Sequence, residues 1–246
     1  MELSERVRAE LDELSRSFFV VILLLVATYL LAEAYAGDDW ASIPLSLFVY
    51  AAVLISIRGV DGSQRLFGLH VLVMVPAVVL TVLGVTIDAG WLLGPGNFLT
   101  TLFAATSLVM ILRFVLTQRR VNSNVIFAAI SVYLLIGIVF GTVFSWVAYG
   151  NEAAFSPPQD VSAGDSSLFY YSFVTLTTLG FGDISPASEG ARALTVVEAL
   201  IGQIYLVVLI ARLVAMHIAR RQSEAAALEA EKLREEIRQM LGRESS

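Results

Sequence analysis

Apolar stretches with few charged residues alternate with polar segments along most of the chain. A helix needs about 20 apolar residues to cross the roughly 30 Å hydrocarbon core of a bilayer, so an apolar run of that length predicts a membrane-spanning helix. Six such runs occur, at residues 18–35, 40–57, 69–87, 98–116, 125–149 and 191–218. The pattern therefore predicts an all-α membrane protein with six transmembrane helices.

The connection between the fifth and sixth runs has a polar half and an apolar half. Two consecutive prolines forbid a helix in the polar half. Residues 168–174 are apolar, and Asp165 or Ser166 can cap a short helix over them that is too short to cross a bilayer. Glycine-rich backbone follows, and irregular backbone at membrane depth is tolerated only where protein buries it or where it lines a water-filled path. We therefore expect a re-entrant pore helix and loop.

Composition and charge agree with a membrane location and predict an orientation. With 57% hydrophobic and 15% charged residues and a mean hydropathy of +0.76, the chain is too apolar for an ordinary soluble domain. The connections 36–42, 88–97 and 150–190 contain eight acidic residues and no Lys or Arg, whereas arginines flank the other ends of the apolar runs. Because Lys and Arg of short loops stay on the cytoplasmic side, both termini are expected in the cytoplasm, with the protein in the cell membrane. The length of the first run and the acidic residues before it favour a retained helix over a cleaved signal peptide.

Other chemistries find little support in the sequence. There is no cysteine, so disulfides and thiol chemistry are excluded. His70 and His217 lie far apart in the sequence, and neither belongs to a catalytic or metal-binding motif. We therefore expect no enzymatic activity, no nucleic acid and no small-molecule substrate, and membrane lipid is the expected surrounding.

Residues 175–183 read TLTTLGFGD and follow the expected short helix. Gly180 and Gly182 can adopt positive φ without steric cost, so this backbone can alternate its handedness and turn successive carbonyls toward one axis. The segment resembles the signature of the tetrameric potassium-channel family, and the resemblance extends over about residues 125–218. It implies a homotetramer whose selectivity filter exchanges the hydration shell of K+ for carbonyl oxygens.

The resemblance also implies roles for individual residues. The carbonyls of Thr178, Leu179, Gly180 and Phe181 would form the K+ sites, Gly182 would complete the filter, and Asp183 would lie at its outer mouth; no cofactor is expected beyond K+ in the pore. The family usually has Val-Gly-Tyr where this chain has Leu-Gly-Phe, so Phe181 lacks the hydroxyl that ties the family's filter to aromatic neighbours. Support from the pore helix must therefore differ, and the candidate residues are Tyr170, Tyr171, Thr175 and Thr177.

The last apolar run carries candidates for gating. Gly202 lies where the family often has a hinge glycine, although close helix packing through a small residue is an equal alternative. From this register, one helical face of the run would line the cavity and contains Gln203, Leu206, Ile210 and Val214. The last two residues of that face could form a hydrophobic constriction that closes by dewetting.

Glu198 lies one helical turn before Gly202, at the level of the pore helix by the family register. A carboxylate at membrane depth is costly, so we expect Glu198 to be neutral or hydrogen-bonded to Thr175, Thr177 or a tyrosine behind the filter. Glu198 would then matter to pore stability and gating. The alternative is a local hydrogen bond in a wet crevice.

The first four runs resemble a voltage-sensor scaffold without its charges. A sensor needs three or four arginines at regular spacing in the fourth helix. Arg113 is the only cation of the fourth run, and it lies where it can reach the interface. We therefore expect little or no voltage dependence.

The sequence divides into four parts. Residues 1–17 form an amphipathic cytoplasmic segment, 18–118 the four-helix domain, 119–218 the pore domain and 219–246 a cytoplasmic helix. The last part has apolar or small residues at three- and four-residue spacing, which is typical of a short coiled coil: Ser223, Ala226, Ala230, Leu233, Ile237 and Met240.

Two other functions fit parts of the pattern. A non-conducting scaffold or regulatory subunit could retain a filter-like loop, and flux of K+ in liposomes would separate it from a channel. Potassium transporters with degenerate pore loops place four filter-like repeats in one chain, whereas this chain has one.

Overall fold

The computed structural model describes residues 18–31, 47, 49–55, 64–87, 89–118, 123–156 and 167–244. The described part is helical, apart from turns, loops and one two-residue antiparallel pairing of strands. An apolar helix covers Phe18–Leu31, and residues 49–55 are also helical. The remaining elements are α3 (Gln64–Thr86), α4 (Gly90–Thr117), α5 (Ser123–Gly150), β1 (Phe155–Ser156), α6 (Ser167–Leu176), β2 (Ser185–Pro186) and α7 (Glu189–Glu244). The all-α prediction is confirmed.

Three described helices are long and apolar enough to cross a membrane. They are Gly94–Thr117, Asn124–Gly150 and Glu189–Met216, and they match the fourth, fifth and sixth predicted runs. Shorter apolar helices at Phe18–Leu31 and His70–Thr86 fall within the first and third runs. Most of the second run, the amphipathic segment 1–17 and the expected caps Asp165 and Ser166 lie outside the described residues.

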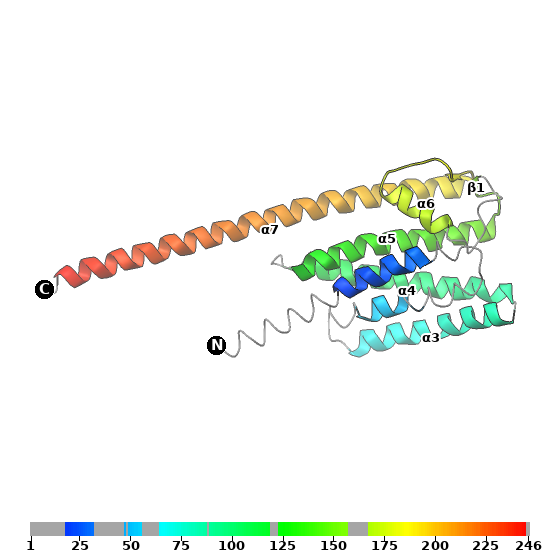
Figure 1. The fold of residues 1–246 in the computed structure, drawn as a ribbon, viewed down its shortest axis with the longest axis horizontal. Coiled ribbons are helices and arrows are strands. Elements are labelled where there is room, and N and C mark those ends of the chain that lie inside the picture. Colours follow the sequence, from blue (N-terminus) through cyan, green and yellow to red (C-terminus); the bar gives the residue numbers. More distant parts are fainter. Residues whose placement is uncertain are drawn as a thin grey trace.

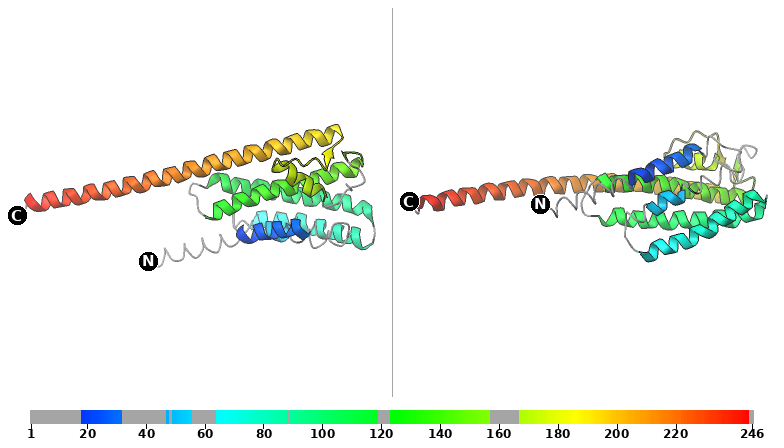
Figure 2. Two further views of the ribbon diagram at one scale, coloured as in Figure 1. Left: turned by 45° about the horizontal axis from the view of Figure 1, so that its top comes forward. Right: turned by 60° about the horizontal axis from the view of Figure 1, so that its bottom comes forward.

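The helices form a bundle in which each helix from α3 to α7 packs on its neighbour in sequence. Figure 1 shows α3, α4 and α5 side by side, with α6 between α5 and α7. The α3–α4 connection, the end of α5 and β1 lie at one end of the bundle, and the end of α4 lies at the other. Both views in Figure 2 show α7 continuing far beyond the bundle at this second end. There the Arg212 guanidinium donates to the Gln118 carbonyl over 2.6 Å, which joins α7 to the end of α4.

Helix α4 begins at Gly90, several residues before the start at 98 that the apolar pattern predicts. Gly94, Pro95 and Gly96 have low helix propensity, which explains the sequence-based boundary. Packing overrides that propensity, because α4 lies so close to α3 that a methyl group at Gly96 would be 3.1 Å from the Thr81 hydroxyl oxygen.

Aromatic contacts join the first described helix to the rest of the bundle. Phe18 stacks on Phe114 of α4 with ring centroids 5.8 Å apart, and Phe19 meets Phe127 of α5 at 5.7 Å. At the other end of the same helix, Tyr29 meets a ring of α6 edge-on at 5.2 Å. One hydrophobic core therefore extends from Phe18–Leu31 through α4 and α5 to α6.

The sixth run and the predicted tail form one continuous helix, α7, of 56 residues. No break separates the predicted pore domain at residue 218 from the helix that follows it. The coiled coil expected in this tail stays a prediction.

Candidate functional site

The backbone of the TLTTLGFGD segment alternates its handedness. Gly180 and Gly182 have φ of 58° and 80°, as their residue type predicts. Thr178 also has positive φ, at 61°, and is the only described residue other than glycine that does. Every second residue from 178 to 182 is therefore left-handed, an alternation that turns successive carbonyls to one side of the chain.

The conformation of Thr178 follows from the way α6 ends. The Leu179 amide donates to the Val174 carbonyl and the Thr178 amide donates to the Thr175 carbonyl, each over 3.0 Å. This pair of hydrogen bonds is the Schellman motif, in which the residue after the helix is left-handed and is usually glycine. A threonine there costs about 1–2 kcal/mol. The residue type does not predict the positive φ of Thr178, because β-branched residues disfavour that conformation.

Helix α6 fits against α5 at two glycines. A methyl group at Gly137 would lie 2.6 Å from Cε1 of Phe173, and one at Gly141 would lie 2.6 Å from Cδ1 of Phe169. Both distances are far below ordinary carbon contact, so the two phenylalanines occupy the space that the missing side chains leave. The position of α6, and with it the start of the TLTTLGFGD segment, depends on these glycines.

The last residue of α6 is held from two sides. The Tyr133 hydroxyl of α5 donates to the Leu176 carbonyl over 3.0 Å. From α7, Gly202 packs so closely that an added methyl group would lie 2.6 Å from Cδ1 of Leu176 and 3.1 Å from its carbonyl oxygen. The structure thus shows the close-packing role of Gly202. Helix α7 is continuous at this residue. The hinge role stays a prediction.

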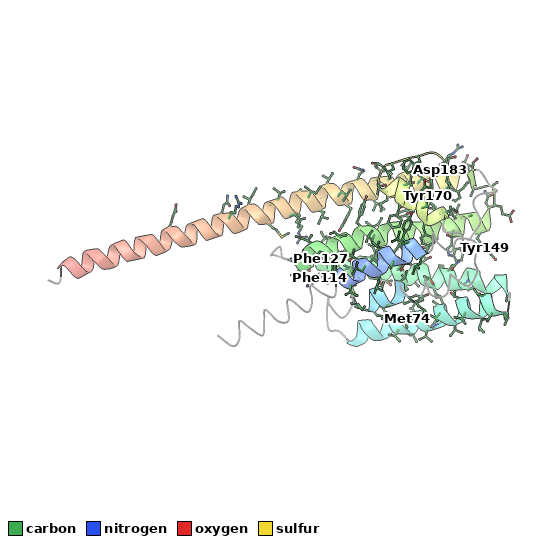
Figure 3. The ribbon with its side chains drawn as sticks, viewed as in Figure 1. Met74, Phe114, Phe127, Tyr149, Tyr170 and Asp183 are labelled. Atoms are coloured by element: carbon green, nitrogen blue, oxygen red, sulfur yellow. The ribbon has the colours of Figure 1, made fainter. Side chains whose placement is uncertain are left out.

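The two tyrosines expected to support the filter make different contacts, and their supporting role stays a prediction. The Tyr170 hydroxyl donates to Oδ2 of Asp183 over 2.7 Å, and both residues lie at the same end of the bundle in Figure 3. This hydrogen bond, together with backbone N–H groups of Asp183 and Ile184, lowers the pKa of the Asp183 carboxyl from its ordinary value. The lowered pKa favours an ionised Asp183 carboxylate, and the hydrogen bond holds it against Tyr170.

Tyr171 points the other way, into the contact between α6 and α7. Its hydroxyl lies 2.6 Å from Oγ1 of Thr195. The Thr195 hydroxyl donates to the Ala191 carbonyl over 2.7 Å, so Tyr171 is the donor in this pair. Its ring is buried between Phe144 and Phe155.

A short strand pairing fixes the chain that follows the TLTTLGFGD segment. β1 pairs with β2 so that Phe155 lies opposite Pro186, and the Ala187 amide donates to the Ala154 carbonyl over 2.8 Å. The return from Asp183 to α7 is thereby attached to the end of α5.

Glu198 is fully buried, with 0% of its surface exposed. The alternative of a wet crevice is therefore wrong for the structure as described. It is hydrogen-bonded, as expected, but its partner is the Ser172 hydroxyl of α6. The predicted partners point elsewhere: the Thr177 hydroxyl donates to the Phe173 carbonyl of its own helix over 2.6 Å. Ser172 was missed because nothing local to either residue reveals a contact between two helices.

The predicted cavity face of α7 is largely uncovered in the single chain. Gln203, Ile210 and Val214 are exposed, and Leu206 is half-buried. Their roles as cavity lining and gate stay predictions.

Comparison with known proteins finds a similarity for this part of the chain. Residues 129–218 match the family model described as ion channel, a little over a third of the chain that includes most of α5, all of α6, the alternating segment and the first half of α7. A comparison with curated protein sequences found no match. The helices and the alternating segment described above therefore lie in a part of the chain that is similar to ion channels.

Proposed function

We propose that four copies of this chain assemble around one axis into a channel that passes K+ selectively and passively across a membrane. The observation that carries the proposal is the alternation of left-handed residues at Thr178, Gly180 and Gly182. Four such segments facing one axis would supply rings of carbonyl oxygens from residues 178–181 that replace the hydration shell of K+.

The strained conformation of Thr178 supports this function. Glycine would satisfy the Schellman motif without strain, but it would remove the hydroxyl that the innermost ion site requires. Strained residues of this kind persist at functional sites where the surrounding structure holds them. The threonine hydroxyl is therefore the chemical gain that offsets the strain.

The surface of the single chain supports assembly into a ring. Only 11% of the most apolar window of α7 is buried, compared with 56% in α5. The side chains of Leu179 and Phe181 are 60% and 66% exposed, although they belong to the matched channel segment. Neighbouring copies around a central axis would cover the apolar surface of α7 and these two side chains. Lipid would cover the outer surface of the bundle.

The proposed arrangement has six spans, with α6 re-entrant and both termini cytoplasmic. The filter segment lies at the same end of the bundle as the α3–α4 connection, whose residues 88–97 contain no Lys or Arg. The end of α4, which Arg119 and Arg120 follow in the sequence, lies at the opposite end. This distribution of charge supports an outer filter and an inner tail.

Channel opening would not depend on a charged sensor. Arg113 is the only cation of α4, lies four residues before its end and is exposed in the single chain. This position allows its guanidinium to reach the inner interface, where a change in the membrane field does little work on it.

The test compares two glycine-to-alanine variants in liposomes. An added methyl group meets no atom within 4 Å at either Gly180 or Gly190, but only Gly180 has positive φ. Gly180→Ala strains each filter strand by about 1–2 kcal/mol and should abolish selective K+ flux, whereas Gly190→Ala should retain it. Equal K+ and Na+ flux through the parent would refute K+ selectivity, and absence of any flux would favour a non-conducting subunit.

A further inference from the structure

Three polar groups from three helices meet behind the filter segment. The Ser172 hydroxyl of α6 lies 2.7 Å from the Gly137 carbonyl of α5, and it is also hydrogen-bonded to Oε1 of Glu198 on α7. Ser172 and Glu198 are both 0% exposed. All three groups belong to one chain, and Ser172 is 35 residues from Gly137 and 26 residues from Glu198 in the sequence.

The number of protons available for these hydrogen bonds indicates whether Glu198 is neutral or ionised. A serine hydroxyl has one proton to donate, and the Gly137 carbonyl can only accept. If Glu198 were a carboxylate, it too could only accept, and one proton would have to serve two acceptors. If Glu198 is a neutral acid, it donates to Ser172 and Ser172 donates to Gly137, so each contact has its own proton.

The surroundings offer no charge that would hold a carboxylate. Within the described part of the chain, no Lys, Arg or His forms an ion pair with Glu198, and its Oε2 has no hydrogen-bond partner. The ionisable groups that face it are the phenols of Tyr133 on α5 and Tyr171 on α6. Their hydroxyls bond to Leu176 and Thr195 instead.

A buried carboxylate without a counter-ion is strongly unfavourable. Glu198 is completely enclosed by its own chain, so neither a neighbouring subunit nor lipid can reach it to compensate.

We propose that Glu198 is a proton-carrying positioning residue, whose neutral acid completes a hydrogen-bond chain from α7 through Ser172 to Gly137 and so holds α6 in place. Loss of its proton breaks the chain and loosens α6. Ser172 lies two residues before Val174, whose carbonyl accepts the amides of Leu179 and Gly180. Movement of α6 at Ser172 is therefore transmitted to the start of the filter segment.

The proton itself is tested by infrared spectroscopy on the full protein in lipid. The parent should show at neutral pH the carbonyl stretch of a protonated carboxylic acid, moved by isotope labelling of glutamate carboxyls. Glu198→Gln should remove the band and Ser172→Ala should shift it. Glu189→Gln is the matched control, because Glu189 is an exposed glutamate of the same helix and its loss should leave the band unchanged. A parent without this band at neutral pH would overturn the proposal whether or not the protein conducts.

The coupling to the filter rests on the proposed channel function and has its own readout. K+ flux through the parent should fall as pH is raised, with the same midpoint as the loss of the infrared band. Glu198→Gln keeps the size and an N–H donor but cannot titrate, so its flux should not follow pH over that range. Flux that ignores the titration of the band would refute the positioning role. If the parent carries no K+ at any pH, the proposed function fails, and the infrared result still decides whether Glu198 holds the proton.

Discussion

Replacement of Gly137 by alanine tests whether the fit between α5 and α6 is as tight as it appears in the structure. The added methyl group would lie 2.6 Å from Cε1 and 2.9 Å from Cζ of Phe173. Carbon atoms in contact prefer about 3.5–4.0 Å, so the ring would have to retreat by about 1 Å. The ring cannot move freely, because it also packs edge-on against the Tyr29 ring.

The expected loss of stability can be separated from the change in helix propensity. Overpacking of this kind costs about 1–3 kcal/mol, while alanine in place of glycine inside a helix returns about 1 kcal/mol. Gly68→Ala in α3 is the matched control, because an added methyl group meets no atom within 4 Å there and only the propensity gain applies. Gly137→Ala should therefore be less stable than Gly68→Ala by the overpacking term alone.

Unfolding in mixed micelles of increasing SDS fraction, followed by near-ultraviolet circular dichroism, measures this difference. Phe173→Leu removes the two closest ring atoms, so it should rescue Gly137→Ala in a double-mutant cycle. At Gly141 the rescue should be smaller, because Cα of Phe169 also lies 3.1 Å from the added methyl group and no substitution removes it. The reasoning is refuted if Gly137→Ala is as stable as Gly68→Ala, or if the cycle shows no coupling with Phe173.

Three further results are expected. Open probability in planar bilayers should change little with voltage, because Arg113 is the only cation of α4. Moving one charge across the membrane field is worth about 2.3 kcal/mol per 100 mV, so a steep conductance–voltage curve would contradict the prediction. Deletion of residues 223–246 should weaken tetramers in detergent without loss of K+ selectivity, and a truncated protein that dissociates on heating at the same temperature as the full chain would disprove the coiled coil. Tyr170→Phe should raise the pKa of Asp183 toward its ordinary value, as followed by carboxyl-carbon NMR. The pKa of Asp183 is lowered in the parent, so the hydrogen bond from Tyr170 stabilises the fold fully at pH values above the ordinary Asp pKa. This stabilisation is lost as pH falls through the lowered pKa. An unchanged Asp183 titration in the variant would show that Tyr170 is not the cause.

Much of the candidate site could be recognised from local properties of the sequence. Gly180 and Gly182 adopt the positive φ that their lack of a side chain predicts, and the short apolar helix before them is present at Ser167–Leu176. The prediction that Glu198 would be hydrogen-bonded followed from the cost of burying a carboxyl group, and it is also confirmed. Each of these inferences needed only a residue type and its place in an apolar run.

The sequence by itself determined the all-α class and the three long apolar helices, because hydrophobicity and helix length are properties of contiguous residues. Only the tertiary structure decided which partner Glu198 has, since Ser172 is 26 residues away and reaches it through the packing of two helices. The same holds for Gly137, whose missing side chain matters only because Phe173 of another helix fills the space. Thr178 is the clearest case: its residue type disfavours positive φ, and the hydrogen bonds that close α6 impose it.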